Sequence, residues 1–330
     1  DGSFRQDRSR LRYRFRVGTT YKNDWYSVGL RIRTGDPNKQ QDPQLTLGKG
    51  FKEFGTLPIG FEKIFFQANW KNTKIWAGKN TYPFEKNNEL FWSDNVFPEG
   101  ITLEKAINVN TKLINEIKLI GGHFILGSND SSFSNDAYLS GLQTSVSGLN
   151  KRVHIFPSLY LFRNIPNIPD GSHTFLIDYT ILHFGTKALL LKDKSISFEL
   201  DFYRNVENYD QSNDVPQNLK NQKTGYTIGL QYGALKTKKD WFFIATYANL
   251  QRYSVVDFMA QNDWARWDYS GDSSPDGRLS NLNGVEIVAA YAINNKMNVV
   301  MKYYTVNQLV TYGIDKETGQ RIRFDLNVKI

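Results

Sequence analysis

The sequence lacks several features on which common classes of protein depend. It contains no cysteine, which excludes a disulfide framework, a zinc–thiolate site and a thiol nucleophile. It has no stretch that approaches the roughly 18 uncharged apolar residues of a membrane-spanning helix, since the candidate at residues 285–293 is interrupted by Glu286. The mean hydropathy is −0.49. A helical membrane protein is therefore excluded.

A strict alternation of arginine with apolar residues stands near the start of the chain. Successive side chains of an extended strand point to opposite faces, so residues 10–17 place guanidinium groups on one face and apolar groups on the other. One wet, anion-attracting face and one hydrocarbon face are typical of a transmembrane β-barrel strand. The two sets are Arg10, Arg12, Arg14 and Arg16, and Leu11, Tyr13, Phe15 and Val17.

The same alternation recurs along the chain and predicts about 15 strands. Aromatic residues make up 14% of the chain, and tryptophans beside several short turns suit a membrane–water interface. We therefore expect an all-β, antiparallel transmembrane β-barrel in the bacterial outer membrane, with residues 1–330 forming a single domain. The clearest segments are residues 26–32, 64–70, 226–232, 285–291, 299–303 and 322–330.

The connections between these segments alternate between short and long, as periplasmic turns and extracellular loops do in outer-membrane barrels. If the short turns are periplasmic, the first visible strand runs towards the periplasm. Because single-chain bacterial barrels have even strand numbers, we expect one further N-terminal strand beyond this sequence, making about 16. Short connections are expected near residues 20–24, 71–73, 109–111, 148–151, 191–194, 236–240 and 294–296. Long ones are expected near residues 36–58, 80–98, 127–136, 163–172, 205–223, 253–281 and 307–319.

Short segments spread over nearly the whole chain carry a family resemblance. They are residues 12–18 with 25–35, 77–79 with 83–84, 97–100, 223–230 with 240–241, and 284–291 leading into 298–304. Together they resemble the putative porin family common in Bacteroidota outer membranes. The resemblance implies a barrel that admits small hydrophilic solutes by passive diffusion. The chain departs from such barrels in having Ile330, rather than phenylalanine, as its last residue.

Charged residues on the expected lumen faces are the candidate pore-lining groups. The basic set would form one continuous wall that attracts anions. The alternative is an ordinary lumen face in which loop carboxylates neutralise the arginines. An acidic set faces the lumen if two apolar sets face lipid, the alternative being cross-strand pairing with lysines such as Lys63. The two apolar sets are Phe175, Ile177 and Tyr179, and Phe198, Leu200 and Phe202. The basic set is Arg8, Arg10, Arg12, Arg14, Arg16, Arg31, Arg33, Arg321 and Arg323, and the acidic set is Asp178, Glu199 and Asp201.

The connection at residues 79–100 is the candidate constriction loop. With the further strand counted it is the third outer loop, the one that folds into the channel in many porins of about 16 strands. Its aromatic residues could pack against the wall, and its carboxylates, Glu85, Glu89 and Asp94, could meet the arginines. An extracellular cap is the alternative.

Metal and catalytic sites are poorly supported. Asp263, Asp268, Asp272 and Asp276 lack the one-three-five spacing of an EF-hand, so a solvated loop is favoured over calcium binding. The histidines (His123, His154, His173 and His183) lie beside no nucleophile motif or metal-ligand spacing. We expect no enzyme, metal or cofactor. A serine beside a histidine on a barrel wall, at Ser140 or Ser158, is the remaining catalytic alternative.

The leading functional hypothesis is a porin for passive diffusion of small hydrophilic solutes, with a preference for anions. Its expected partners are outer-membrane lipid, lipopolysaccharide and the solutes, and the net charge of +8 is too diffuse to indicate nucleic acid. The sequence leaves open a homotrimer. The main alternative is a structural or docking β-barrel subunit of an envelope complex with a blocked lumen, and a soluble β-sandwich binder is a third.

Overall fold

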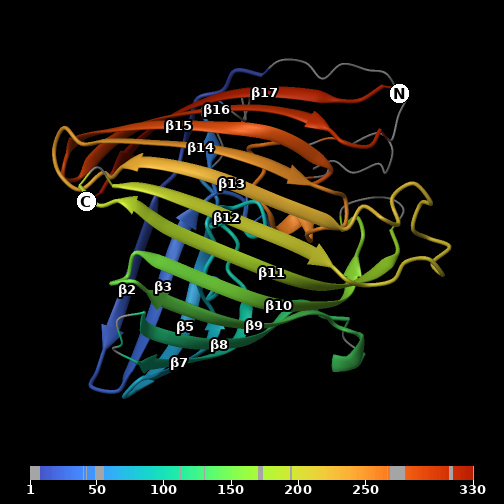
Figure 1. Ribbon diagram of the computed structural model, residues 1–330, viewed down its shortest axis with the longest axis horizontal. Helices are drawn as coiled ribbons and strands as arrows, with labels where there is room; N and C mark the ends of the chain where they lie inside the picture. Colours follow the sequence, from blue (N-terminus) through green and yellow to red (C-terminus); the bar gives the residue numbers. More distant parts are fainter. Residues whose placement is uncertain are drawn as a thin grey trace.

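Fifteen antiparallel strands form one curved sheet in the computed structural model of this chain. The structure describes residues 8–329 except residues 40, 42, 49–55, 110, 112, 130, 170–173, 194, 266, 268–278 and 312–314. The strands follow one another in chain order around the sheet (Figure 1). They are β2 (Arg16–Lys22), β3 (Tyr26–Thr34), β5 (Ile59–Trp70), β6 (Thr73–Lys79), β7 (Glu99–Asn108), β8 (Ile114–Gly127), β9 (Ala137–Gly148), β10 (Val153–Pro166), β11 (Leu176–Leu191), β12 (Ile196–Asn205), β13 (Thr224–Gly233), β14 (Trp241–Leu250), β15 (Leu282–Asn294), β16 (Met297–Gln308) and β17 (Thr318–Val328).

The connections confirm the expected alternation of short turns and long loops. Hairpin turns join β2 to β3, β5 to β6 and β15 to β16, whereas long loops join β3 to β5, β6 to β7 and β14 to β15. Two short 3-10 helices, η1 (Phe133–Asn135) and η2 (Asp257–Met259), lie in long loops. In the part of the chain that the structure describes, no helix is long and apolar enough to cross a membrane.

The arginine ladder is not one continuous strand, and this corrects the expectation for residues 10–17. Arg12–Tyr13 forms the two-residue strand β1, which pairs with β4 (Leu45–Thr46) of the first long loop, and the main sheet begins only at Arg16. The partner strand β3 ends at Thr34, whose hydroxyl accepts a hydrogen bond from the Phe15 amide at 3.0 Å. The described residues that precede Phe15 have no partner strand in the main sheet. Arg12 and Tyr13 therefore pair with β4 of the loop instead.

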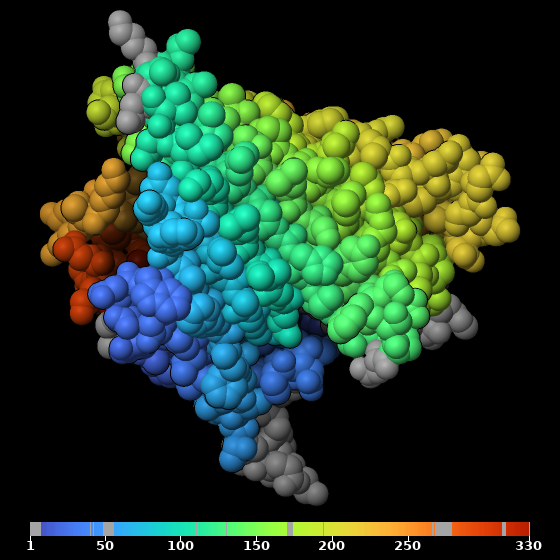
Figure 2. All heavy atoms as spheres, turned by 90° about the horizontal axis from the view of Figure 1, so that it is seen from below, coloured from blue at the N-terminus to red at the C-terminus, as the bar shows by residue number. Residues whose placement is uncertain are grey.

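Side chains alternate between an apolar outer face and a mixed inner face. On β17 the exposed set is Ile322, Phe324, Leu326 and Val328, between half-buried Arg321, Arg323, Asp325 and Asn327, as the sequence predicts. Figure 2 shows one outer face of the sheet, where the colours run in chain order from blue through green to yellow. Large apolar residues are exposed on all its parts, among them Leu30, Phe66, Leu142, Leu182 and Leu230. Such a surface needs hydrocarbon around it.

The sheet is not closed among the described residues, because β2 and β17 are its two edges. In a succession of fifteen antiparallel strands the first and last run in the same direction. A direct ladder between these two edges would therefore be parallel, unlike every other pair in the sheet.

One side of the interior is filled by a hydrophobic cluster. Many of its wall residues, such as Tyr160 and Tyr203, come from β8 to β12, and others come from β6 and from β14 to β16. The long loops supply further members, such as Phe91 and Trp92. The Phe91 and Tyr203 rings are stacked with their centroids 5.3 Å apart. The cluster thus fills the interior beside β8 to β12, whereas both cavities described below lie beside the N-terminal part of the sheet.

Close packing on this filled side makes Gly185 sensitive to substitution. A Cβ atom at Gly185 would lie 1.9 Å from the Phe156 ring, which is itself 2% exposed and cannot swing into free space. We expect Gly185→Ala to lower the free energy of unfolding by about 1–3 kcal/mol. The control is Gly121→Ala, since a Cβ there meets nothing within 4 Å. Urea unfolding in lipid vesicles measures both, and equal stabilities would contradict this packing.

Candidate functional site

A buried carboxylate, that of Glu62, holds three arginines of the basic wall. Arg16 Nη2 lies 2.5 Å from Glu62 Oε1, and Arg31 Nε lies 2.6 Å from Glu62 Oε2. Arg33 Nε lies 3.9 Å from Glu62 Oε1. The Glu62 side chain is 1% exposed, so little water screens these charges. Arg16 also donates to Asn95 Oδ1 of the β6–β7 loop at 2.8 Å. Within the described residues one carboxylate thus serves three guanidinium groups.

A β-bulge brings Glu62 to the interior. Arg31 lies opposite Lys63 and Ile32 lies opposite Phe61, so Glu62 is an extra residue between two paired ones. Phe61 is 62% exposed on the outer face, whereas Glu62 is buried. Strict alternation from the outward-facing Ile64 and Phe66, with which the predicted segment begins, would have put Glu62 outside. This is why a functional residue central to the wall escaped the sequence pattern.

The arginines of β17 converge on a second carboxylate, Asp263, in the β14–β15 loop. Arg321 Nη1 lies 2.9 Å from Asp263 Oδ1, and Arg323 Nη1 lies 2.7 Å from Asp263 Oδ2. Arg323 Nε lies 2.8 Å from Asp325 Oδ1. Burial alone would raise the pKa of the Asp263 carboxyl, but the two arginines and Lys302 outweigh it and lower the pKa below its usual value. A loop carboxylate therefore stays ionised and pairs with this end of the wall.

Basic residues from both ends of the chain line one cavity. Arg12, Arg14 and Arg16 surround a space of about 350 Å³ together with Arg323 of β17. Acidic residues, among them Asp263, line the same space. The remaining N-terminal members of the predicted basic set, Arg8 and Arg10, are exposed and precede the first strand. The two ends of the predicted wall thus meet, and carboxylates are interspersed between them.

Two of the three predicted acidic residues face the interior. Glu199 and Asp201 of β12 are 5% and 0% exposed. Glu199 Oε1 lies 2.5 Å from Lys187 Nζ on the neighbouring strand β11. The local arrangement at Glu199 is therefore cross-strand pairing, the alternative that the sequence left open.

Asp178 lies on the opposite face, and this corrects its expected orientation. Its neighbours Ile177 and Tyr179 are 5% and 1% exposed in the interior, whereas the Asp178 side chain is 49% exposed. Asp178 Oδ2 lies 3.8 Å from Arg163 Nε near the loop end of β10. The physical reason is that the aromatic face of β11 packs against the filled interior rather than against lipid.

The loop of residues 80–98 lies inside the sheet and reaches the opposite wall, where its cyan coil is visible in Figure 1. Asn88 Nδ2 donates to Asp201 Oδ2 at 3.0 Å and to Thr227 Oγ1 at 2.8 Å. Asn87 Nδ2 donates to the backbone carbonyls of Thr186 and Leu200 at 3.0 and 3.1 Å. The segment starts at β6 and is therefore fastened to β11, β12 and β13.

The carboxylates of this inserted loop have partners other than the arginines. Glu85 Oε1 accepts a hydrogen bond from Ser145 Oγ at 2.8 Å. Glu89 Oε2 accepts from the Asp94 amide at 2.8 Å, and Asp94 Oδ1 lies 2.7 Å from Lys86 Nζ. These groups fix the shape and position of the loop. Glu89 and Asp94 also line the smaller cavity together with Arg12, Arg14 and Arg16, so these two carboxylates lie beside the arginine wall, as expected.

A serine–histidine–aspartate chain lies on the wall beneath the loop. Ser158 Oγ lies 3.2 Å from His183 Nδ1, and His183 Nε2 lies 2.9 Å from Asp201 Oδ1. The order matches a hydrolytic relay, but Ser158 is 8% exposed and its Oγ also accepts from Gln143 Nε2 at 2.9 Å. Because Asp201 also accepts from Asn88, the chain links the loop to three neighbouring strands. A second pair, His123 Nδ1 and Ser140 Oγ, lies 2.8 Å apart and exposed.

The described residues contain no cluster of three or more histidine, aspartate or glutamate side chains that could hold a metal ion. Asp263, the first aspartate of the calcium candidate, is engaged by arginines. Asp268, Asp272, Asp276, His173 and Ile330 lie outside the residues that the structure describes.

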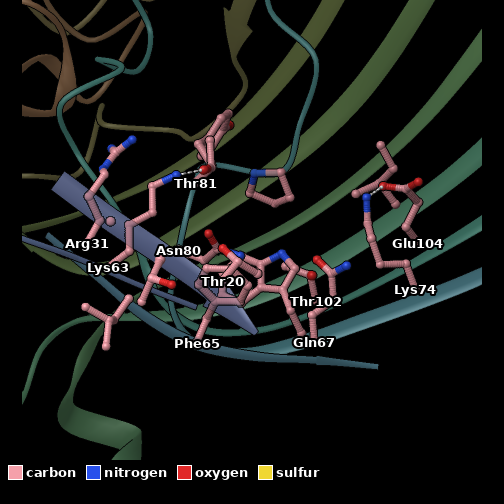
Figure 3. A pocket seen from close by; sticks show the side chains of 17 residues that line it. Thr20, Arg31, Lys63, Phe65, Gln67, Lys74, Asn80, Thr81, Thr102 and Glu104 are labelled. Carbon is pink, nitrogen blue, oxygen red and sulfur yellow. Dashed lines mark hydrogen bonds and ion pairs between the residues drawn. The ribbon is translucent and has the colours of Figure 1, made fainter. Parts of the chain in front are cut away.

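A second, larger cavity of about 580 Å³ lies beside the inserted loop (Figure 3). Its lining comes from β2, β3, β5, β6, β7 and β8 and from the first residues of the loop. Arg31 and Lys63 lie at one end, and the Lys74–Glu104 pair lies at the other, with nitrogen and oxygen 2.5 Å apart. This is the hollow part of the interior that the aromatic cluster leaves open.

Comparisons with known proteins agree with this geometry. A family model described as Putative porin matches residues 3–180, and no match was found among curated proteins. Wzi of Escherichia coli, described as a carbohydrate-binding outer-membrane β-barrel involved in capsule assembly, has 9% identity and a TM-score of 0.58, over 96% of this chain and 71% of that one.

Two further solved structures of lower similarity, the first described as an outer-membrane channel, span most of both chains. The channel DcaP of Acinetobacter baumannii has 12% identity and a TM-score of 0.45, covering 95% of this chain and 83% of that one. OpdQ of Pseudomonas aeruginosa has 10% identity and a TM-score of 0.46, covering 96% and 80%. Since the family model covers more than half of the chain, this outer-membrane β-barrel protein belongs to the Putative porin family.

Proposed function

We propose that this chain allows passive diffusion of small hydrophilic solutes and prefers anions. Family membership supports the porin activity. The preference rests on one observation: two guanidinium groups, those of Arg16 and Arg31, share the single carboxylate of Glu62, and each lines a cavity. A local excess of positive charge beside a water-accessible cavity raises the concentration of anions there.

In this mechanism the inserted loop narrows the path and the arginines select the solute. Residues 80–98 and the aromatic cluster occupy the β9–β13 side, so solutes would pass along the charged side, between the two cavities. Glu62 keeps the arginine side chains extended and ordered without cancelling their combined charge. The wall then stabilises a passing anion with groups that are already in position.

Removing lumen charge is expected to reduce anion preference. In Arg12→Gln/Arg14→Gln, two cations that line the smaller cavity are lost. The reversal potential of the channel in a KCl gradient should therefore shift in the direction that indicates a lower permeability to chloride relative to potassium. The matched control, Lys236→Gln/Lys238→Gln, removes two exposed charges from the turn before β14. Planar-bilayer recording measures both. Absence of conductance in the unmodified protein overturns the porin proposal, and an unchanged reversal potential in the arginine variant overturns the anion preference.

A blocked barrel that docks a partner is the second candidate. The observation that favours it is the extent of the filling, since the buried cluster includes residues of the long loops such as Trp92, Tyr253 and Trp264. A protein that co-purifies with a stoichiometric partner and conducts no ions in bilayers would favour this candidate over the porin.

We also propose that the Ser158–His183–Asp201 chain is structural rather than catalytic. Ser158 lines neither cavity, and its hydroxyl is engaged by Gln143 as well as by His183. A substrate would have to displace the Phe91 and Tyr160 rings, which lie with their centroids 6.4 and 6.0 Å from that of His183.

A further inference from the structure

The larger cavity contains one cation that no carboxylate neutralises. Arg31 is paired with Glu62 and Lys74 with Glu104. Lys63, by contrast, is within ion-pair distance of no carboxylate in the described part of the chain. Its ammonium group donates to Thr81 Oγ1 and lies 5.0 Å from the centroid of the Phe97 ring. Thr81 and Phe97 therefore orient the Lys63 charge towards the cavity without cancelling it (Figure 3).

The bulge at Glu62 determines this position. Because Glu62 is the extra residue, Glu62 and Lys63 both face the interior although they are consecutive. The Glu62 carboxylate pairs with the arginines, and the Lys63 ammonium group faces the cavity. The bulge thus lets one strand present a carboxylate that neutralises the arginines and, next to it, an ammonium group that is available to a ligand.

The middle of the cavity is suited to a ring that carries hydroxyl groups. Phe65 supplies aromatic surface, against which the apolar face of a sugar ring can pack, whereas Trp76 is 3% exposed and only closes part of the lining. Gln67 and Thr102 lie near Phe65 and supply hydrogen-bond donors and acceptors (Figure 3). The far end is formed by the Lys74–Glu104 pair, where the Lys74 ammonium group can donate hydrogen bonds to further hydroxyls and the Glu104 carboxylate can accept them. The cavity volume of about 580 Å³ lies in the range of small-molecule sites, about 300–1,000 Å³.

We propose that this cavity is a binding site for small sugar acids with one carboxylate, such as a hexuronate. The carboxylate pairs with Lys63 and Thr81, the ring lies along Phe65, and the hydroxyls bond to Gln67 and Thr102. An inorganic anion would use only the Lys63 end, and a neutral sugar would leave Lys63 unpaired. The proposal rests on the proposed porin function, because the solute reaches the cavity through the lumen.

Binding of D-glucuronate to the purified protein in detergent tests the site by titration calorimetry. We expect D-glucuronate to bind roughly tenfold more tightly than glucose, phosphate or benzoate, since only it uses both the charge and the hydroxyl contacts. Lys63→Met should weaken glucuronate binding roughly tenfold, while Lys63→Arg should retain most of it. The control, Lys118→Met, removes a lysine that lies outside the cavity and beside Glu116.

Gln67→Ala/Thr102→Val keeps the charge and removes the hydroxyl partners, and it should bring the affinity for glucuronate down to that for acetate. Equal binding of glucuronate and glucose, or no effect of Lys63→Met, overturns the proposal. Conductance in KCl, measured on the same preparation, distinguishes failure of the sugar-acid site from failure of the proposed porin function. A conducting protein that binds no glucuronate refutes this site alone, whereas a non-conducting protein that binds glucuronate refutes the porin function and the lumen route.

Discussion

Glu62→Gln is expected to lower the free energy of unfolding by about 3–5 kcal/mol, because removal of one partner leaves buried charges uncompensated. Glu62 is 1% exposed on its side chain, and Arg33 is 4% exposed. Glutamine keeps the shape of the side chain and one acceptor oxygen. A loss of stability would therefore result from the missing charge rather than from altered packing. The same variant should make the channel more anion-selective, since Glu62 would no longer offset the charges of Arg16 and Arg31.

Glu104→Gln is the matched control for this change. Glu104 is paired with Lys74 on a neighbouring strand, but the two side chains are 21% and 37% exposed. A pair screened in this way contributes about 0–1 kcal/mol. Unfolding by urea in lipid vesicles, followed by heat-modifiable migration on gels, compares the two variants. Equal losses for both would refute the central role assigned to Glu62.

Replacing residues 85–95 with a short glycine–serine linker is expected to raise single-channel conductance several-fold. These residues fill the space between β6 and the β11–β13 wall, where Asn88 binds Asp201 and Thr227. Without them the lumen becomes as wide as the sheet allows, and a barrel of about 16 strands leaves an aqueous channel. Solutes too large for the unmodified protein should then enter, which liposome swelling with sugars of increasing size measures.

The control replaces residues 131–135, which are exposed in another long loop, with a linker of the same kind. Shortening that loop should leave both conductance and size limit unchanged. If the two loop variants behave alike, or if the 85–95 variant conducts no better than the unmodified protein, the inserted loop does not restrict the path.

The sequence predicts the strands well because one face of each strand must be apolar. β17 shows this most clearly, since Ile322 and Phe324 are exposed and Arg321 and Arg323 face inwards. The alternation of short and long connections is also readable, because hairpin turns and long polar loops differ in length and composition. Both properties are local, so they can be deduced without knowing which strands meet.

The site was harder to predict, for two physical reasons. A bulge shifts the alternation at Glu62, where the outward apolar residues change from Ile59 and Phe61 to Ile64 and Phe66, and the predicted segment began only after it. The aromatic face of β11 was expected to face lipid, but Tyr179 packs against residues of the inserted loops and Asp178 is turned outwards. In both cases the deciding contact comes from a distant part of the chain. The convergence of Arg321 and Arg323 on Asp263 is of the same kind.

The inserted loop also gives the sheet two halves with different mechanical properties. Strands β10, β11 and β12 have apolar side chains outside, and inside they pack against the aromatic cluster and a buried hydrogen-bond network that includes His183 and Asp201, so water has little access to their ladder hydrogen bonds. Strands β2, β3 and β5 carry water-facing charges and pack against fewer neighbours. We therefore expect a stiff half that exchanges amide protons slowly and a pliable half that opens more readily. A passing solute would then be accommodated by movement of the pliable half alone, while the stiff half holds the loop in place.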